Sequence, residues 1–144
     1  MIIALIGESC TGKTTLAQSL QEVLAAKVMQ GKEYLKMAKN PLQAKQVFQE
    51  YLNEYEQANQ YLIYVIAEQE QAAMLPDRTV RILMTADLEL KLERFATRMK
   101  GTLPPPVEQM IRRNHGQFDQ MAHDMHIHNG QYDMQDILQL IGEI

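Results

Sequence analysis

Short segments with the character of strands, the first of them strongly apolar, alternate along the chain with longer amphipathic stretches. The first, at residues 2–6, is continuously apolar and rich in β-branched side chains. This pattern is typical of a strand buried on both faces of a parallel sheet. Residues 61–67 and 80–85 are predicted to be further, mainly apolar strands, and short strands are expected at residues 27–29 and 124–128, which gives five strands in all.

The stretches between these segments carry apolar residues at helical spacing, such as Leu16, Leu20 and Leu24 after the first strand. Asn40 and Pro41 give the second helix an N-cap followed by proline at its first position. The expected helices are residues 14–25, 41–60, 87–100 and 107–122, and a last one capped by Asp133. The alternation of strand and helix predicts a three-layer α/β fold, with right-handed crossovers and helices on both faces of a parallel sheet.

Composition narrows the class of protein. The chain has 144 residues, of which 46% are apolar, and a net charge of −4. We therefore expect one domain over residues 1–144 and no nucleic-acid partner. No apolar run approaches the roughly 18 residues of a membrane span, and the N-terminal run is too short for a signal peptide. With Cys10 as the single cysteine, no internal disulfide forms. We expect a cytoplasmic monomer or homodimer.

A glycine-rich motif follows the first predicted strand. It matches G-x-x-x-x-G-K-[ST] in full and consists of Gly7, Glu8, Ser9, Cys10, Thr11, Gly12, Lys13 and Thr14. The glycines let the loop curl so that backbone N–H groups converge on phosphate oxygens, and the helix that begins there adds its positive end. We expect Lys13 to reach the β- and γ-phosphates of ATP, Thr14 to bind Mg²⁺ and Thr15 to contact the α-phosphate. The alternative is a glycine-rich turn that happens to contain Lys-Thr.

Four segments together resemble the P-loop nucleoside and nucleoside-monophosphate kinases, above all the cytidylate-kinase-like and guanylate-kinase-like branches. They are residues 7–15, the apolar strand with acidic end at 61–70, residues 80–100 with the arginines that follow, and residues 124–129. The resemblance implies a P-loop NTPase fold with strand order 2-3-1-4-5 and a lid at about residues 98–112. It also implies an ATP-dependent kinase of a small molecule, with ATP and Mg²⁺ as cofactors.

Arginines are the candidates for stabilising the transferring phosphoryl group. The transfer spreads negative charge over phosphate oxygens, which the planar guanidinium binds in pairs. The resemblance assigns Arg94 or Arg98 to ATP, Arg112 to the transferring group, and Asn129 to the surroundings of the adenine. Arg94 and Arg98 share one helix face, so a solvated face is the alternative, and Arg113 is an equal alternative to Arg112.

Glu68 follows the strand predicted at residues 61–67. An acidic residue at this place is suited to hold Mg²⁺ through water, or to accept a proton from the acceptor hydroxyl. The alternative is that Glu68 and Glu70 open a helix, where acidic residues are favourable.

The acceptor side departs from the monophosphate kinases, which hold an acceptor phosphate with arginines. No arginine precedes Arg78, although Lys32, Lys36 and Lys39 offer point charges. The gap favours a nucleoside or another small alcohol over a nucleotide as acceptor. An alternative from another class is a nucleotide-binding regulatory module, or a slow NTPase, without any acceptor. A second pocket beside the loop, lined by residues 32–39 and Glu68, would favour the kinase.

Three histidines gather near the last predicted strand. His126 and His128 share one face of it, and Asp124 is near in sequence. Such residues are suitable ligands of a metal ion. The pattern favours the alternative, in which they are sheet-end residues near solvent.

Overall fold

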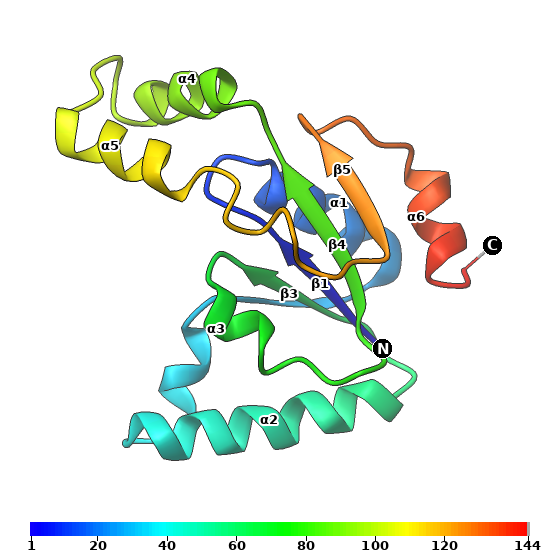
Figure 1. Ribbon diagram of the computed structural model, residues 1–144. Coiled ribbons are helices and arrows are strands. Elements are labelled where there is room, and N and C mark those ends of the chain that lie inside the picture. The colour runs from blue at the N-terminus through cyan, green and yellow to red at the C-terminus, as the bar shows by residue number, and fades with distance from the viewer. Residues whose placement is uncertain (144) are drawn as a thin grey trace.

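The computed structural model describes residues 1–143 and contains one five-stranded sheet (Figure 1). Its order, β2-β3-β1-β4-β5, confirms the predicted order, and every neighbouring pair is parallel. The strands are β1 (Ile2–Ile6), β2 (Lys27–Gln30), β3 (Leu62–Ile66), β4 (Val80–Thr85) and β5 (Met125–His128). Because all strands are parallel, their carboxyl ends meet at one edge of the sheet, where open α/β sheets bind ligands.

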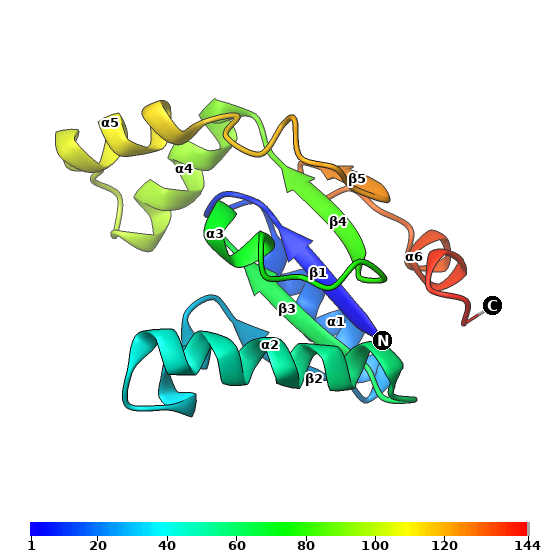
Figure 2. The same cartoon turned by 60° about the horizontal axis from the view of Figure 1, so that its bottom comes forward.

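Helices cover both faces of this sheet (Figures 1 and 2). One face packs against α1 (Lys13–Leu24) and α6 (Met134–Leu140), and the other packs against α2 (Pro41–Gln57), the 3₁₀ helix η1 (Glu33–Met37) and α3 (Gln69–Ala72). The central strand β1 serves both cores, because successive side chains of a strand point to opposite faces. Ile2 and Ile6 join the core that contains Phe48, and Ile3 and Leu5 join the core that contains Leu16.

Two further helices, α4 (Leu88–Arg98) and α5 (Pro105–Asn114), project beyond the carboxyl ends of the strands. The turn between them, at residues 99–104, contains Gly101 and ends at Pro104, the N-cap of α5. The predicted lid at residues 98–112 corresponds to this turn and most of α5. No helix within residues 1–143 has both the length and the apolar character needed to span a membrane.

The structure corrects the limits of two predicted helices. The helix predicted at residues 107–122 begins at Pro105 and ends at Asn114, and turns follow it. The chain leaves the helix at His115, whose backbone is extended. Gly116 follows with a positive φ of 85°, and its N–H donates to Oε2 of Glu8, 3.2 Å away. The helix predicted at residues 41–60 ends at Gln57. The sequence pattern also missed the short helix η1, which has no extended apolar periodicity.

Candidate functional site

The phosphate loop joins β1 to α1 and depends on its two glycines. The N–H of Gly7 donates to the carbonyl of Ile66 at 3.1 Å, and a Cβ on Gly7 would lie 2.2 Å from the carbonyl oxygen of Met84. Gly12 has a φ of 94°, in the left-handed region that favours glycine. The hydroxyl of Thr11 donates to the carbonyl of Glu8 at 2.8 Å and closes the loop from inside. The loop is therefore locked into its curled shape before any ligand binds.

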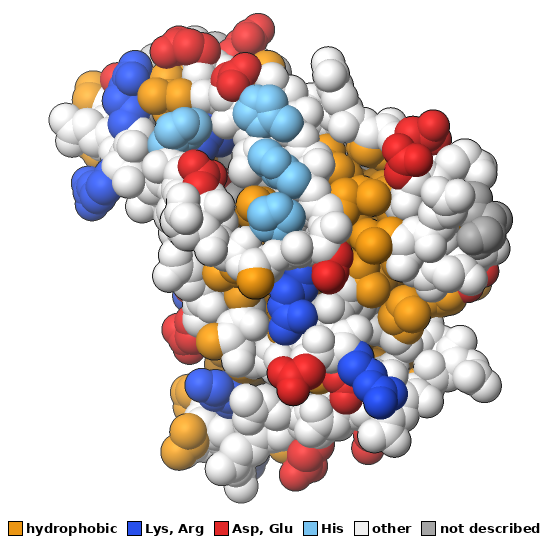
Figure 3. All heavy atoms as spheres, turned by 45° about the vertical axis from the view of Figure 1, so that its right-hand side comes forward, with side chains coloured by type: hydrophobic (Ala, Val, Ile, Leu, Met, Phe, Trp, Pro, Cys, Tyr) orange, Lys and Arg blue, Asp and Glu red, His pale blue; other side chains and the backbone are white. Residues whose placement is uncertain are grey.

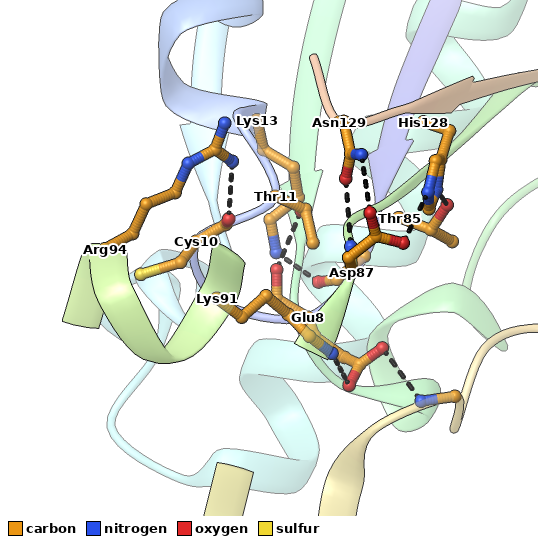
Figure 4. A network of polar contacts seen from close by, with 12 residues as sticks. Glu8, Cys10, Thr11, Lys13, Thr85, Asp87, Lys91, Arg94, His128 and Asn129 are labelled. Carbon is orange, nitrogen blue, oxygen red and sulfur yellow. Dashed lines mark hydrogen bonds and ion pairs between the residues drawn. The ribbon is translucent and has the colours of Figure 1, made fainter. Parts of the chain in front are cut away.

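Lys13 lies beneath this loop. Its ammonium group donates to the carbonyl oxygens of Gly7 and Ile66, the latter at 2.9 Å, and its side chain is buried (Figure 4). Burial lowers the pKa of Lys13 to about 8, against the opposing effect of the Glu8 carboxylate. A cation that is held by backbone carbonyls and poorly solvated is well placed to exchange these contacts for phosphate oxygens.

Two cavities adjoin the phosphate loop on the side of α1. The phosphate-loop cavity, of about 330 Å³, is lined by residues of the loop and of the ends of β2 and β3, namely Ser9, Cys10, Gly12, Lys13, Thr14, Thr15, Gln30, Gly31, Lys32, Val65, Ala67 and Arg98. The Asn129 cavity, of about 340 Å³, is lined by Cys10, Gly12, Thr15, Arg94, Arg98, Asn129, Gly130 and Tyr132. The two share Cys10, Gly12, Thr15 and Arg98, so together they form one trough along the loop.

Helix α4 brings two predicted arginines to this trough. Arg94 donates to the carbonyl oxygen of Cys10 at 2.8 Å (Figure 4), and Arg98 lines both cavities. Burial raises the pKa of the Cys10 thiol in spite of these cations, so this side chain is a neutral filler of the loop. Arg112 lies elsewhere, on α5, where it pairs with Glu108 of the same helix at 3.7 Å. It lines neither cavity of the trough.

Lys91 was not predicted from the sequence as a residue of the site. Its Nζ atom lies 2.8 Å from Oε1 of Glu8, and both side chains are buried although they are 83 positions apart in the sequence (Figure 4). The signal for it was the helical spacing that places Lys91 on the same face as Arg94 and Arg98. Glu8, which was predicted only as a member of the loop, thus directs a carboxylate away from the trough.

This ion pair forms part of a third hollow, the Glu8 cavity, of about 210 Å³. Its walls come from the phosphate loop, the end of β3, α4, α5 and the segment after α5, and its lining residues are Glu8, Ser9, Ala67, Glu68, Lys91, Phe95, Met110, Ile111, Asn114 and Gln117. Ser9 and Ala67 also line the phosphate-loop cavity, so the two hollows meet at these residues. A group bound in one is therefore adjacent to a group bound in the other.

Glu68 lies at the end of β3, as predicted, and it caps α3. Its side chain and that of Gln71 form a capping box, which shows that Glu68 does open a helix. Its carboxylate also pairs with Lys32 at 3.4 Å, with both side chains about half exposed. Glu68 still lines the Glu8 cavity, and its role toward Mg²⁺ stays a prediction. Lys36 and Lys39 are exposed and line none of the three cavities.

All four histidines of the chain line a fourth hollow, the histidine cavity, of about 250 Å³ near the edge strand β5. Figure 3 shows histidines side by side on this surface. Within residues 1–143, no three histidine, cysteine, aspartate or glutamate side chains are arranged to hold a metal ion. Instead, the hydroxyl of Thr85 lies between His126 and His128, at 2.6 and 2.7 Å from their nitrogens.

The sequence matches no protein-family model, and no curated protein matches it significantly. Solved structures do match. A sugar kinase from a Janibacter species has a TM-score of 0.64 at 13% identity, covering 97% of this chain and 93% of its own. The shikimate kinase from Acinetobacter baumannii in complex with shikimate has a TM-score of 0.60 at 19% identity, covering 97% of this chain and 89% of its own. The YorR protein from Bacillus subtilis in complex with phosphorylated GDP has a TM-score of 0.58 at 18% identity, covering 98% of this chain and 93% of its own. The chain therefore has the fold of the P-loop kinases.

Proposed function

We propose that the protein transfers the γ-phosphoryl group of ATP to a hydroxyl of a small acceptor that carries little negative charge. The observation that carries this proposal is the Glu8 cavity, which meets the phosphate-loop cavity at Ser9 and Ala67. A kinase needs such a second hollow, because acceptor and phosphoryl donor must be held next to each other. A module that only binds a nucleotide has no need of it.

The residues of the trough fit ATP with Mg²⁺. The curled loop has no room for a side chain at Gly7, as expected where backbone N–H groups surround phosphate oxygens. Thr14 is exposed to the phosphate-loop cavity, where its hydroxyl is suited to bind the metal. Bound Mg²⁺ would neutralise charge on the β- and γ-phosphates. The nucleoside part then falls in the Asn129 cavity, which continues the trough.

The cations around the loop are suited to stabilise the transition state. Lys13 and Arg98 line the phosphate-loop cavity, and Arg94 contacts the loop through the carbonyl of Cys10. Lys91 adds a fourth cation on the acceptor side, in contact with Glu8. The fold holds Lys13, Lys91 and Arg94 by hydrogen bonds, and Arg98 is exposed beside them. Preorganised charge of this kind is a large part of catalysis in phosphoryl transfer. The role of Arg112 stays a prediction, because its guanidinium pairs on its own helix.

The charges of the Glu8 cavity argue against a phosphorylated acceptor. Among the residues that the structure describes, Lys91 is the only cation that lines it, and this ammonium is already paired with Glu8. A phosphate group placed there would face the carboxylates of Glu8 and Glu68 without a free cation to compensate it. The shortage of free cations in the cavity agrees with the lack of arginine before Arg78. The resemblance to cytidylate and guanylate kinases in particular stays a prediction.

The remaining lining suits a small polar molecule. Asn114 and Gln117 offer amide groups that both donate to and accept from hydroxyls, and Phe95 and Met110 supply apolar surface. The volume of about 210 Å³ is below the range of roughly 300 to 1,000 Å³ that pockets for drug-sized ligands have. The acceptor class that we propose is therefore an uncharged alcohol of the size of a polyol, a sugar or at most a nucleoside.

The test is ADP formation from ATP and Mg²⁺ in the presence of matched pairs of compounds, each an uncharged alcohol and its monophosphate. Sugars, polyols and nucleosides are all available as such pairs. We expect stimulation by an uncharged member and none by its monophosphate, and no stimulation in a Lys13→Ala variant. Preference for a monophosphate would contradict the proposed acceptor class. ATP binding without stimulation by any compound would favour a nucleotide-binding regulatory module.

A further inference from the structure

Asp87 stands at the N-cap of α4 but does not cap its own helix. An aspartate at this position ordinarily accepts from the first free N–H groups of the helix, whereas the side chain of Asp87 makes no such bond. Both of its oxygens reach the end of β5 instead (Figure 4). Oδ1 lies 3.0 Å from Nε2 of His128, and Oδ2 accepts from Nδ2 of Asn129 at 2.9 Å.

The contact between Asp87 and Asn129 is reciprocal. The backbone N–H of Asp87 donates to Oδ1 of Asn129 at 2.9 Å, while Nδ2 of Asn129 donates to the carboxylate. The two bonds fix the orientation of the amide. If oxygen and nitrogen were exchanged, Nδ2 would face an N–H and Oδ1 would face a carboxylate. One hydrogen on Nδ2 and one lone pair on Oδ1 remain for a ligand.

Asn129 occupies a place where this orientation matters. Asn129 and Gly130 have φ values of 56° and 73°, and the N–H of Gln131 donates to the carbonyl of His128 at 3.1 Å, which defines a tight turn with two left-handed residues. The turn lies against the phosphate loop, since a Cβ on Gly12 would lie 4.0 Å from Cα of Gly130. Both turn residues line the Asn129 cavity.

A chain of hydrogen bonds continues from Asp87 to the edge of the sheet. The hydrogen bonds from Asn129 and from His128 lower the pKa of the Asp87 carboxyl, so this group is an ionised acceptor. In neutral His128 the proton is therefore on Nε2, and the bare Nδ1 accepts from the hydroxyl of Thr85 at 2.7 Å. Thr85 in turn accepts from Nε2 of His126 at 2.6 Å. One assignment of hydrogens satisfies the whole chain, and it holds the Asp87 carboxylate from the side opposite Asn129.

We propose that Asp87 and His128 are positioning residues for nucleotide recognition, which hold the Asn129 amide in the orientation that contacts the base or ribose of the bound nucleotide. This inference rests on the proposed function, in which the Asn129 cavity takes the nucleoside part. Neither Asp87 nor His128 lines that cavity, and both belong to the lining of the histidine cavity. They act only through Asn129.

The test compares the dissociation constants of ATP–Mg²⁺ and of inorganic tripolyphosphate–Mg²⁺. We expect Asp87→Asn and His128→Gln to weaken ATP binding about 3- to 10-fold, as for the loss of one hydrogen bond, and to leave the affinity for tripolyphosphate unchanged. Asn129→Ala should have the same effect. The double variant Asp87→Asn, Asn129→Ala should bind ATP as tightly as Asn129→Ala alone, because Asp87 acts through Asn129. Matched controls are Asp119→Asn and His123→Gln. Both residues line the histidine cavity but are not members of the hydrogen-bond chain that begins at Asp87.

A ¹⁵N spectrum of the neutral form of His128 gives an independent readout, with Nε2 protonated and Nδ1 bare in the wild type and this preference lost in Asp87→Asn. Equal affinities of wild type and Asp87→Asn for ATP would overturn the positioning role and leave the proposed function standing. A parallel loss of tripolyphosphate binding would also overturn it, because it would indicate a general disturbance of the loop. A wild type that binds neither ligand would overturn the proposed function together with this inference.

Discussion

The ammonium group of Lys91 lies 2.8 Å from the carboxylate of Glu8, and the two side chains are 1% and 9% exposed. Glu8 belongs to the phosphate loop and Lys91 to α4, and the second oxygen of Glu8 accepts from the N–H of Gly116 at 3.2 Å. One carboxylate therefore holds together the loop, the helix that carries Arg94 and Arg98, and the segment that follows α5. These are the walls of the Glu8 cavity.

Removal of one partner of this pair should destabilise the fold strongly. Lys91→Met leaves the Glu8 carboxylate buried without its cation, which costs about 3 to 5 kcal/mol in comparable cases. The double variant Glu8→Gln, Lys91→Met should regain most of this loss, because no charge remains buried. Urea unfolding measures the free energies, with Lys100→Met at an exposed position as the control. A loss below about 1 kcal/mol for Lys91→Met would show that water reaches Glu8.

Lys13 should make the stability of the free protein depend on alkaline pH. Its pKa is lowered from 10.5 to about 8 in the folded chain, so between these values the unfolded chain binds more protons. Stability should therefore rise as pH increases from about 8 to 10.5, by up to about 3 kcal/mol. Lys13→Met should lack this rise and should be at least as stable as the wild type at pH 7. Denaturant titrations at pH 7, 8.5 and 10 measure it, and equal slopes in both proteins would contradict the assignment.

The same shift predicts that ATP binding weakens at alkaline pH. Phosphates bind the ammonium form of Lys13, which the free protein loses as pH rises through about 8. The dissociation constant of ATP–Mg²⁺ should then increase up to about tenfold per pH unit above that value. Calorimetry in buffers of different ionisation enthalpy should detect proton uptake on binding near pH 8.5. Binding without proton uptake would show that Lys13 keeps its proton in the free protein.

Gly7, which is buried in the phosphate loop, and Gly101, which is exposed in the turn between α4 and α5, should respond differently to alanine. At Gly7 a Cβ would lie 2.2 Å from a backbone carbonyl of β4, so the loop or the strand must move. We expect Gly7→Ala to cost at least about 3 kcal/mol and to abolish ATP binding. Gly101, unlike Gly7, has a positive φ, but nothing lies within 4 Å of its added Cβ, and Gly101→Ala should cost only about 1 kcal/mol. Comparable losses would contradict the close approach at Gly7.

Asn114→Ala should separate the acceptor site from the nucleotide site. The amide of Asn114 lines the Glu8 cavity but neither cavity of the trough. Loss of one hydrogen bond to the acceptor should raise its KM about 3- to 10-fold and leave the KM of ATP unchanged. Gln109→Ala, at an exposed position of the same helix, is the matched control. If the KM of ATP changed and the KM of the acceptor did not, the assignment of Asn114 to the acceptor site would be wrong.

Local pattern was sufficient for the sheet and the phosphate loop. Buried parallel strands such as β1 and β3 are apolar along their whole length, and the loop has a motif whose glycines are required by its geometry. The end of α5 was not predictable in this way. It is set by the contact of Gly116 with Glu8, which is 108 positions away in the sequence.

The acceptor side was harder to predict for the same reason. Lys91 has the sequence surroundings of an exposed helix residue, and only its pairing with Glu8 buries it. Glu68 was given two interpretations, and a capping box with Gln71 shows that it opens a helix. The hydrogen-bond chain from Asp87 through Thr85 to His126 joins β4 and β5. Its members come from two segments that are distant in the sequence, so the pattern within either segment does not predict it.

The most direct test of phosphoryl transfer does not require the acceptor to be known. Purified protein is incubated with ATP labelled at the γ-phosphate, Mg²⁺ and a small-molecule extract of cells, and labelled products are separated by charge. We predict label in an acid-stable organic phosphate with the wild type, and none with Lys13→Ala. Label that appears only in inorganic phosphate, or equally with Lys13→Ala, would contradict the assignment of this protein as a kinase.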